Sequence, residues 1–249
     1  MPATSALIVA AGLGVRMGAR GQLSPKGMIA LDGLTLARAS VMHLASRGVD
    51  QVRIVTGHLA DIYRQEFSAT DGVELIHNGD YHASGSLKSL LTGLEGLSGD
   101  VIILESDIMY EARALDPLTK GTTGLVVSGA THAGDEVYVW ANTDGQLLDM
   151  SKNGAYRAAD HFGELVGVSS VASGDLDAFR ATGHRILADN VKADYEDCLV
   201  AHAADNPFAT HLIPDLIWAE VDDEDMLAHA YKHVWPHASA GLIERRKAM

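Results

Sequence analysis

Residues 6–18 read ALIVAAGLGVRMG, and this stretch decides the fold. Six apolar residues stand before the first glycine, a pattern typical of a buried strand that ends in a turn. The loop that follows holds several glycines and cationic residues, among them Gly12, Gly14, Arg16, Gly18, Gly21 and Lys26. Glycines let backbone N–H groups approach a polyphosphate, and cations supply the positive charge that it needs. The stretch therefore predicts a strand with a phosphate-binding loop, the alternative being a glycine-rich turn without a ligand.

The spacing of these glycines excludes two common nucleotide loops. Glycines at 12, 14 and 18 do not match the G-x-G-x-x-G of dinucleotide-binding proteins, and no helical pattern follows them directly. The second predicted strand also runs into Val55-Thr56-Gly57-His58 without a ribose-binding acid. A Walker A loop would close on Gly-Lys-Ser/Thr, which this loop does not contain.

Apolar runs alternate with helical patterns through the first half of the chain. Strands are expected at 6–11, 51–56, 73–77 and 101–105, and helices at 34–47, 60–67 and 86–97. This rhythm indicates a doubly wound, mostly parallel sheet with helices on both faces. After residue 110 shorter strands are expected at 125–128, 137–141, 147–150, 165–171 and 211–220, with helices at 176–187, 195–204 and 224–234. We expect one domain over 1–249, with nucleotide binding in 1–110 and acceptor binding in 111–249.

The combination A-A-G-x-G-x-R-M followed by P-K resembles the signature of the nucleotidyltransferase family. The nearest members are the cytidylyltransferases for small phosphonates and for phosphocholine. The resemblance implies a Rossmann-like α/β fold of the nucleotide-diphospho-sugar transferase type, with an inserted acceptor-binding β region. It also implies transfer of a nucleoside monophosphate from an NTP to a phosphate or phosphonate, with release of pyrophosphate. In such enzymes the base meets the main chain at Ala10, Ala11, Gly12 and Gly14, while Arg16 and Lys26 act on the phosphates.

Two carboxylates are expected to hold a metal ion. The buried strand at 101–105 leads to Asp107, and ligands of open α/β sheets collect at the carboxyl ends of strands. Mg²⁺ takes one or two carboxylates together with phosphate oxygens and water. The family commonly has D-x-D here, whereas Glu105 stands in the first place. The resemblance assigns the second ligand to Asp222, whose alternative role is to cap the last helix.

The remaining site residues are expected on loops and helix starts. Gly85, Ser86 and Ser89 lie where a base or ribose meets a helix N-terminus, although Ser86 as a simple helix cap is the alternative. The resemblance places Glu136, Lys152, Tyr195, Glu196 and Asp197 around the acceptor. Carboxylates suit a primary ammonium, which donates hydrogen bonds, better than a trimethylammonium, which aromatic rings recognise. This favours 2-aminoethylphosphonate over phosphocholine, unless these acids merely belong to a solvated surface.

Composition limits the partners. The net charge is 19 − 33 = −14, which argues against nucleic-acid and membrane surfaces. One cysteine, Cys198, and the lack of a signal peptide or an 18-residue apolar run fit a cytoplasmic protein. A homodimer is possible. We expect CTP and Mg²⁺ as partners of a phosphonate cytidylyltransferase; phosphocholine, another alkylphosphonate or a sugar 1-phosphate as acceptor, and a nucleotide-sensing regulator, are the alternatives.

Overall fold

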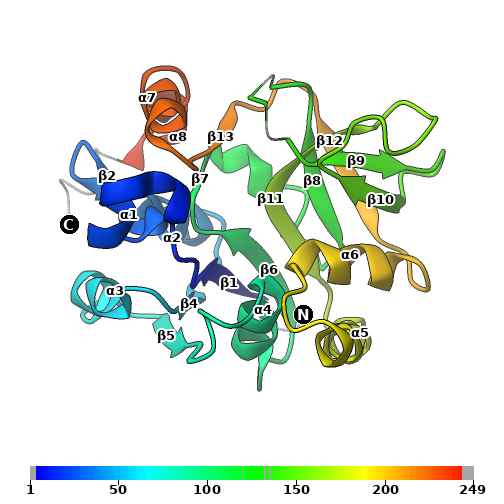
Figure 1. The fold of residues 1–249 in the computed structure, drawn as a ribbon, viewed down its shortest axis with the longest axis horizontal. Coiled ribbons are helices and arrows are strands. Elements are labelled where there is room, and N and C mark those ends of the chain that lie inside the picture. The colour runs from blue at the N-terminus through cyan, green and yellow to red at the C-terminus, as the bar shows by residue number, and fades with distance from the viewer. Residues whose placement is uncertain (1–3, 120, 132, 135, 243–249) are drawn as a thin grey trace.

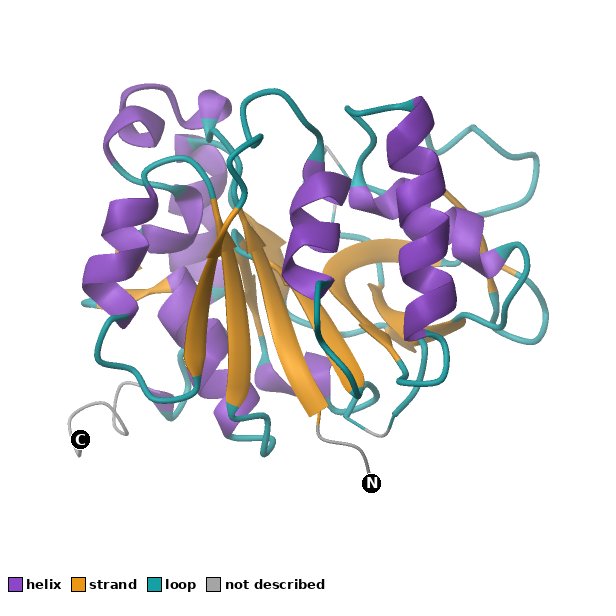
Figure 2. Cartoon of the chain, turned by 90° about the horizontal axis from the view of Figure 1, so that it is seen from below, coloured by secondary structure: helices purple, strands orange, loops and turns teal. Residues whose placement is uncertain are grey.

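A mixed sheet with a parallel centre organises the molecule (Figure 1). The computed structural model describes residues 4–119, 121–131, 133, 134 and 136–242, and within them the sheet has nine strands. At its centre the order is β5-β4-β1-β6, all parallel, from β1 (Thr4–Ala10), β4 (Gln51–Thr56), β5 (Val73–His77) and β6 (Asp100–Glu105). Figure 2 shows these strands side by side.

Helices cover both faces of this centre because successive residues of a strand point to opposite sides. Ala6 and Ile8 pack with α2 (Leu36–Ala45) and α3 (Ala60–Phe67) on one face. Leu7 packs on the other face with α4 (Ser86–Leu94), α5 (Leu176–Asp189) and α6 (Tyr195–Ala203). The predicted doubly wound α/β class is therefore confirmed.

The second half of the chain extends the same sheet with antiparallel strands. Strand β11 (Gly163–Val171) pairs antiparallel with β6, and it carries β8 (Gly124–Ser128) and β9 (Tyr138–Ala141). β9 continues to β10 (Leu147–Ser151), and β12 (Ala209–Ile213) lies parallel to β8. The sheet is thus continuous across residue 110. The separation into a nucleotide-binding half and an acceptor-binding half at that residue stays a prediction.

The predicted strand 211–220 is two strands. β12 ends at Ile213, and β13 (Trp218–Glu220) pairs instead with β7 (Ile108–Tyr110), away from the main sheet. Pro214 follows β12 directly and has no N–H to donate to a ladder, which explains the break. The chain then forms α7 (Glu224–His233) and α8 (Trp235–Ala238).

The glycine-rich segment is more ordered than the loop predicted from its sequence. It contains 3-10 turns at Val15–Met17 and Lys26–Met28 around α1 (Gly18–Leu23), whose Ala19, Arg20, Gln22 and Leu23 are helix formers. The short strands β2 (Ala30–Leu31) and β3 (Leu34–Thr35) follow, so α2 begins later than predicted, with Thr35 as its N-cap. In the described part of the chain, no helix has the length and apolar character needed to cross a membrane.

Candidate active site

The site lies where the strand order of the sheet reverses. β1 has β4 on one side and β6 on the other, and Val9 pairs in register with Glu105. The loop after β1 and the acids after β6 therefore leave the sheet side by side. Such a crevice at the carboxyl ends of parallel strands is where open α/β sheets bind ligands.

The glycine-rich loop folds back on itself and is anchored to the C-terminal part of the chain. A Cβ atom on Gly21 would lie 2.2 Å from the carbonyl oxygen of Gly14, so only glycine allows this approach. Met17 is buried and packs in one cluster with Val221 and Leu227. The exposed ion pair of Arg20 with Glu224 adds a contact between the loop and α7.

Lys26 lies between the two acids that were predicted as metal ligands. Its Nζ atom is 2.8 Å from Oδ2 of Asp107, and it also contacts Oδ1 of Asp222, whose other oxygen contacts Arg16. Burial opposes the charge on Lys26, but Asp107 and Asp222 outweigh it and raise the lysine pKa. The two predicted catalytic cations and the two predicted ligands thus form one cluster.

A third and a fourth acid join this cluster. Oxygen atoms of Glu105, Asp107 and Glu220 lie within 4.8 Å of one another. Burial, together with the charge of Asp107, raises the pKa of Glu105 to about 8, and burial with Glu105 raises that of Glu220 to about 9. Carboxylates held this close favour a proton or a cation between them. The carboxylates of Glu105, Asp107 and Glu220 together fit a divalent cation such as Mg²⁺.

Two adjoining cavities open at this cluster. The first, of about 300 Å³, is lined by residues of the loop and of the cluster: Ala10, Gly12, Gly14, Arg16, Lys26, Ser86, Asp107 and Tyr195 among them. The second, of about 580 Å³, extends between β11, β13 and α7. Four residues line both cavities and mark their junction: Glu105, Lys152, Glu196 and Glu220.

Several acidic residues contribute to the lining of the second cavity. Glu136, Lys152 and Glu196 line it, as predicted for the acceptor side. Burial raises the pKa of Glu196 to about 7, and its Oε2 atom is buried without a hydrogen-bond partner among the described residues. Tyr195 begins α6 and donates its hydroxyl hydrogen to Glu105. The Glu196 carboxylate lines the cavity with one oxygen that has no hydrogen-bond partner among the described residues. It therefore offers a place for a cation that donates hydrogen bonds.

Five predicted site residues do not line either cavity: Asp222, which contacts Lys26 and Arg16, and four residues with other surroundings. Ser89 is buried and accepts a hydrogen bond from Asn78, 3.0 Å away. Ala11 is buried, and Gly85 packs against the backbone before α6. Asp197 accepts the backbone N–H of Asp194 in a capping box of α6. Their assigned roles stay predictions.

Glu220 is the residue that the sequence-based prediction missed. It stands two residues before Asp222, and in extended chain such residues share a face. That spacing was the available signal. It becomes visible only when 218–220 is recognised as a separate strand beside β7.

Known proteins resemble the chain in both sequence and fold. A 2-aminoethylphosphonate cytidylyltransferase of Lancefieldella rimae is 26% identical over 242 residues, which cover 92% of each chain. A CMP-5'-(3-aminopropyl)phosphonate synthase of Streptomyces rubellomurinus is 29% identical over 233 residues. The aligned region covers 88% of this chain and 37% of that protein.

Solved structures share the fold at low identity. An inositol-1-phosphate CTP transferase from T. maritima superposes with a TM-score of 0.80 at 15% identity, covering 97% of this chain and 98% of that one. A CTP:phosphocholine cytidylyltransferase from Streptococcus pneumoniae gives 0.76 at 17% identity, covering 92% and 98%. The family model for the MobA-like NTP transferase domain matches residues 6–161. The chain therefore belongs to the MobA-like NTP transferase domain family and is a nucleotidyltransferase.

Proposed function

We propose that the protein transfers CMP from CTP to an aminoalkylphosphonate such as 2-aminoethylphosphonate, with release of pyrophosphate, in a reaction that depends on a divalent cation. The phosphonate enzymes named above, at 26% and 29% identity, support this acceptor class. A cytoplasmic location and a homodimer remain part of the proposal.

The observation that carries the proposal is the junction of the two cavities. Lys152 lines both of them, beside the nucleotide loop on one side and the acidic acceptor cavity on the other. A lysine there suits the phosphonate group of an acceptor that must meet the α-phosphorus of the nucleotide. Glu136 and Glu196 line the cavity beyond it, on the side where the ammonium end would extend.

The reaction requires positioning and charge neutralisation more than proton transfer. An ionised phosphonate oxygen of the acceptor attacks the α-phosphorus in line, and the bond to the bridging oxygen of pyrophosphate breaks. Lys26 and Arg16 exchange their carboxylate partners for phosphate oxygens, and so offset the charge of the transition state. Glu105, Asp107 and Glu220 would hold a divalent cation, which would supply further positive charge near the phosphates.

Recognition of a primary ammonium follows from hydrogen bonding. Glu196 has a buried carboxylate oxygen without a partner among the described residues, and a primary ammonium has three N–H donors. A trimethylammonium group has none, so it would leave that oxygen unsatisfied. The Glu136 carboxylate gives the cavity a second acidic group for the same end of the acceptor.

Phosphocholine is the second candidate acceptor because Trp218 also lines the cavity. An indole ring attracts a quaternary ammonium through its π face. The Trp218 Nε1 atom donates a hydrogen bond to Ser128 at 2.7 Å, which fixes the ring in the cavity wall.

A pyrophosphate-release screen tests the proposal. The four NTPs are combined with 2-aminoethylphosphonate, phosphocholine, a hydroxyalkylphosphonate and a hexose 1-phosphate in the presence of Mg²⁺. We expect the highest kcat/KM with CTP and 2-aminoethylphosphonate, and a phosphonate–phosphate anhydride in the ³¹P spectrum. A preference for phosphocholine or for a sugar phosphate would replace the acceptor, and no release with any pair would favour a nucleotide sensor.

A further inference from the structure

The acids that complete the site sit on a short, isolated ladder. Strand β13 has three residues and pairs only with the three residues of β7 in the described chain. The ladder continues by one bond at its site end, where the N–H of Val221 donates to the carbonyl of Asp107 at 2.9 Å. Glu220 and Asp222 therefore depend on its register. A slip by one residue would turn Glu220 away from Asp107.

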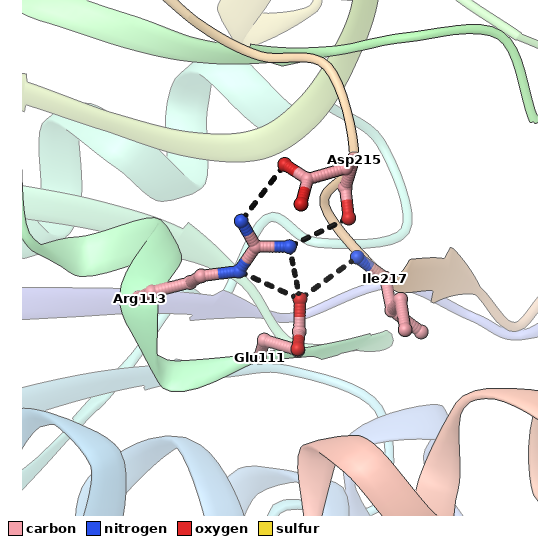
Figure 3. A network of polar contacts seen from close by, with 4 residues as sticks. All are labelled: Glu111, Arg113, Asp215 and Ile217. Atoms are coloured by element: carbon pink, nitrogen blue, oxygen red, sulfur yellow. Dashed lines mark hydrogen bonds and ion pairs between the residues drawn. The ribbon is translucent and has the colours of Figure 1, made fainter.

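A polar clamp closes the other end of this ladder (Figure 3). The N–H of Glu111 donates to the carbonyl of Ile217 at 3.1 Å, and the N–H of Ile217 donates back to Oε2 of Glu111 at 3.0 Å. Arg113 donates from Nε to the same carboxylate oxygen at 2.8 Å. It also reaches the carbonyl of Asp215 at 2.6 Å.

The hydrogen bonds of Glu111 and Arg113 to backbone groups hold this segment more firmly than the ion pair between Arg113 and Asp215 does. The Asp215 side chain is 81% exposed, and an exposed pair contributes little to stability. The Glu111 carboxylate is only 22% exposed and holds a main-chain N–H directly. Arg113 joins that carboxylate to a carbonyl two residues earlier on the same segment. The guanidinium therefore fixes the position of the chain entering β13.

This segment also forms a wall of the acceptor cavity. Leu216, Ile217 and Trp218 line the cavity, and Glu220 lines both cavities. Only four residues lie between Ile217, which the clamp holds, and Asp222, which contacts Lys26. One short stretch thus connects the clamp, the acceptor wall and the acidic cluster.

We propose that Arg113 and Glu111 are positioning residues, which set the register of β13 and thereby the placement of the Glu220 and Asp222 carboxylates and of the acceptor wall. The part of this inference that concerns the acceptor rests on the proposed function. The part about the placement of the Glu220 and Asp222 carboxylates depends only on the fold of this chain. The two parts have separate measurements.

The variant Arg113→Ala tests the proposal in the full-length protein. Loss of supporting groups around metal ligands commonly costs about 10- to 100-fold in affinity, and we expect about tenfold weaker binding of Mn²⁺ alone, followed by electron paramagnetic resonance. Backbone amides of 216–221 should exchange with deuterium faster than in the parent. The KM for 2-aminoethylphosphonate should rise, while the KM for CTP changes less.

Three further variants separate positioning from general stability. Arg47→Ala removes a comparable pair, with Asp116, outside the ladder, and should leave Mn²⁺ affinity unchanged. Asp215→Ala keeps the carbonyl that Arg113 uses, so it should resemble the parent. Glu111→Gln keeps an oxygen for Ile217 but loses the charge that holds Arg113, and should give a smaller change of the same kind.

Equal Mn²⁺ affinity and equal exchange of 216–221 in Arg113→Ala and Arg47→Ala would overturn the proposal. If Arg113→Ala does not fold, Glu111→Gln carries the same test with the same criteria. A parent protein that releases no pyrophosphate would refute the proposed function only, because metal binding and exchange are measured without an acceptor.

Discussion

One continuous loop supplies most of the predicted residues on the nucleotide side, whereas the acceptor side is assembled from separate segments. Gly12, Gly14, Arg16 and Lys26 lie within fifteen residues of one another and line the first cavity together. The second cavity draws on β11, β13, α6 and α7, and on the segment just before β9. A local motif therefore identifies the first region, while only folding brings the second together.

The two regions also differ in charge compensation. On the nucleotide side Lys26 and Arg16 contact acids, so its charges are paired. At the junction Glu105 and Glu220 have pKa values raised by burial and by neighbouring acids, and Glu196 has a carboxylate oxygen without a partner in the described chain. This difference is what the proposed function requires, with a polyanionic nucleotide in the first region and the ammonium end of the acceptor in the second.

The largest effect is expected from breaking the paired cluster on the nucleotide side. Lys26→Ala and Asp107→Asn should each lower kcat at least about 100-fold, because each removes charge that stabilises the transition state. The measurement is steady-state pyrophosphate release with CTP and 2-aminoethylphosphonate. Arg64→Ala, which removes an exposed pair on α3, is the control. Near-normal turnover in both variants would reject the mechanism.

A smaller, more selective effect is expected on the acceptor side. Glu196→Gln should raise the KM for 2-aminoethylphosphonate about tenfold, the size of one lost charge-assisted hydrogen bond, with the KM for CTP unchanged. Phosphocholine, which cannot donate to Glu196, should show a smaller change. Glu74→Gln, on the outer strand β5, serves as the matched acid. An unchanged KM would remove Glu196 from ammonium recognition.

The same contrast explains what could be predicted from the sequence. The parallel strands β4 and β5 and helix α3 agree with their expected ranges because apolar periodicity and flanking turns are local signals. Asp107 is expected from its place after a buried strand, whereas Asp222 is expected only through family resemblance. No spacing along the chain relates residues 26 and 222, which the sheet topology brings together.

Glu220 and the clamp of Glu111 with Arg113 show where such prediction fails. Pro214 inside the segment 211–220 is a local signal of a break, but nothing in the periodicity of 218–220 shows that its partner is β7. The placement of Glu220 beside Asp107 depends on antiparallel pairing with β7, a contact of high sequence separation. The capping role of Asp197, by contrast, is a local one that its position at a helix start makes predictable.

The acids at the junction predict a dependence of stability on pH. Glu105 and Glu220 have ordinary pKa values of 4.5, raised in the folded protein to about 8 and about 9. At pH values between the ordinary pKa and the raised pKa, the folded state binds more protons than the unfolded state. The free energy of unfolding should therefore fall as pH rises through this window. We expect the metal-free protein to melt a few degrees lower at about pH 9 than at about pH 6. Added Mg²⁺ should reduce the difference.

A variant isolates this effect from the other titrating groups. Replacing both acids, Glu105→Gln with Glu220→Gln, removes the two carboxyl groups while keeping their approximate volume. Its melting temperature should depend less on pH, and Mg²⁺ should no longer raise it. The same pH dependence in parent and variant would show that other groups cause it.

The smallest effect is expected at Asp197, where the two regions meet at the start of α6. Its carboxylate accepts the N–H of Asp194 at 3.0 Å, and Asp194 in turn caps the helix. Loss of such a cap costs about 0.5–2 kcal/mol, so Asp197→Ala should lower the melting temperature by a few degrees. The KM for 2-aminoethylphosphonate should stay within about twofold of the parent, because Asp197 lines neither cavity. A rise in KM as large as that of Glu196→Gln would instead place Asp197 in acceptor binding, and would extend the acceptor side around the end of the helix.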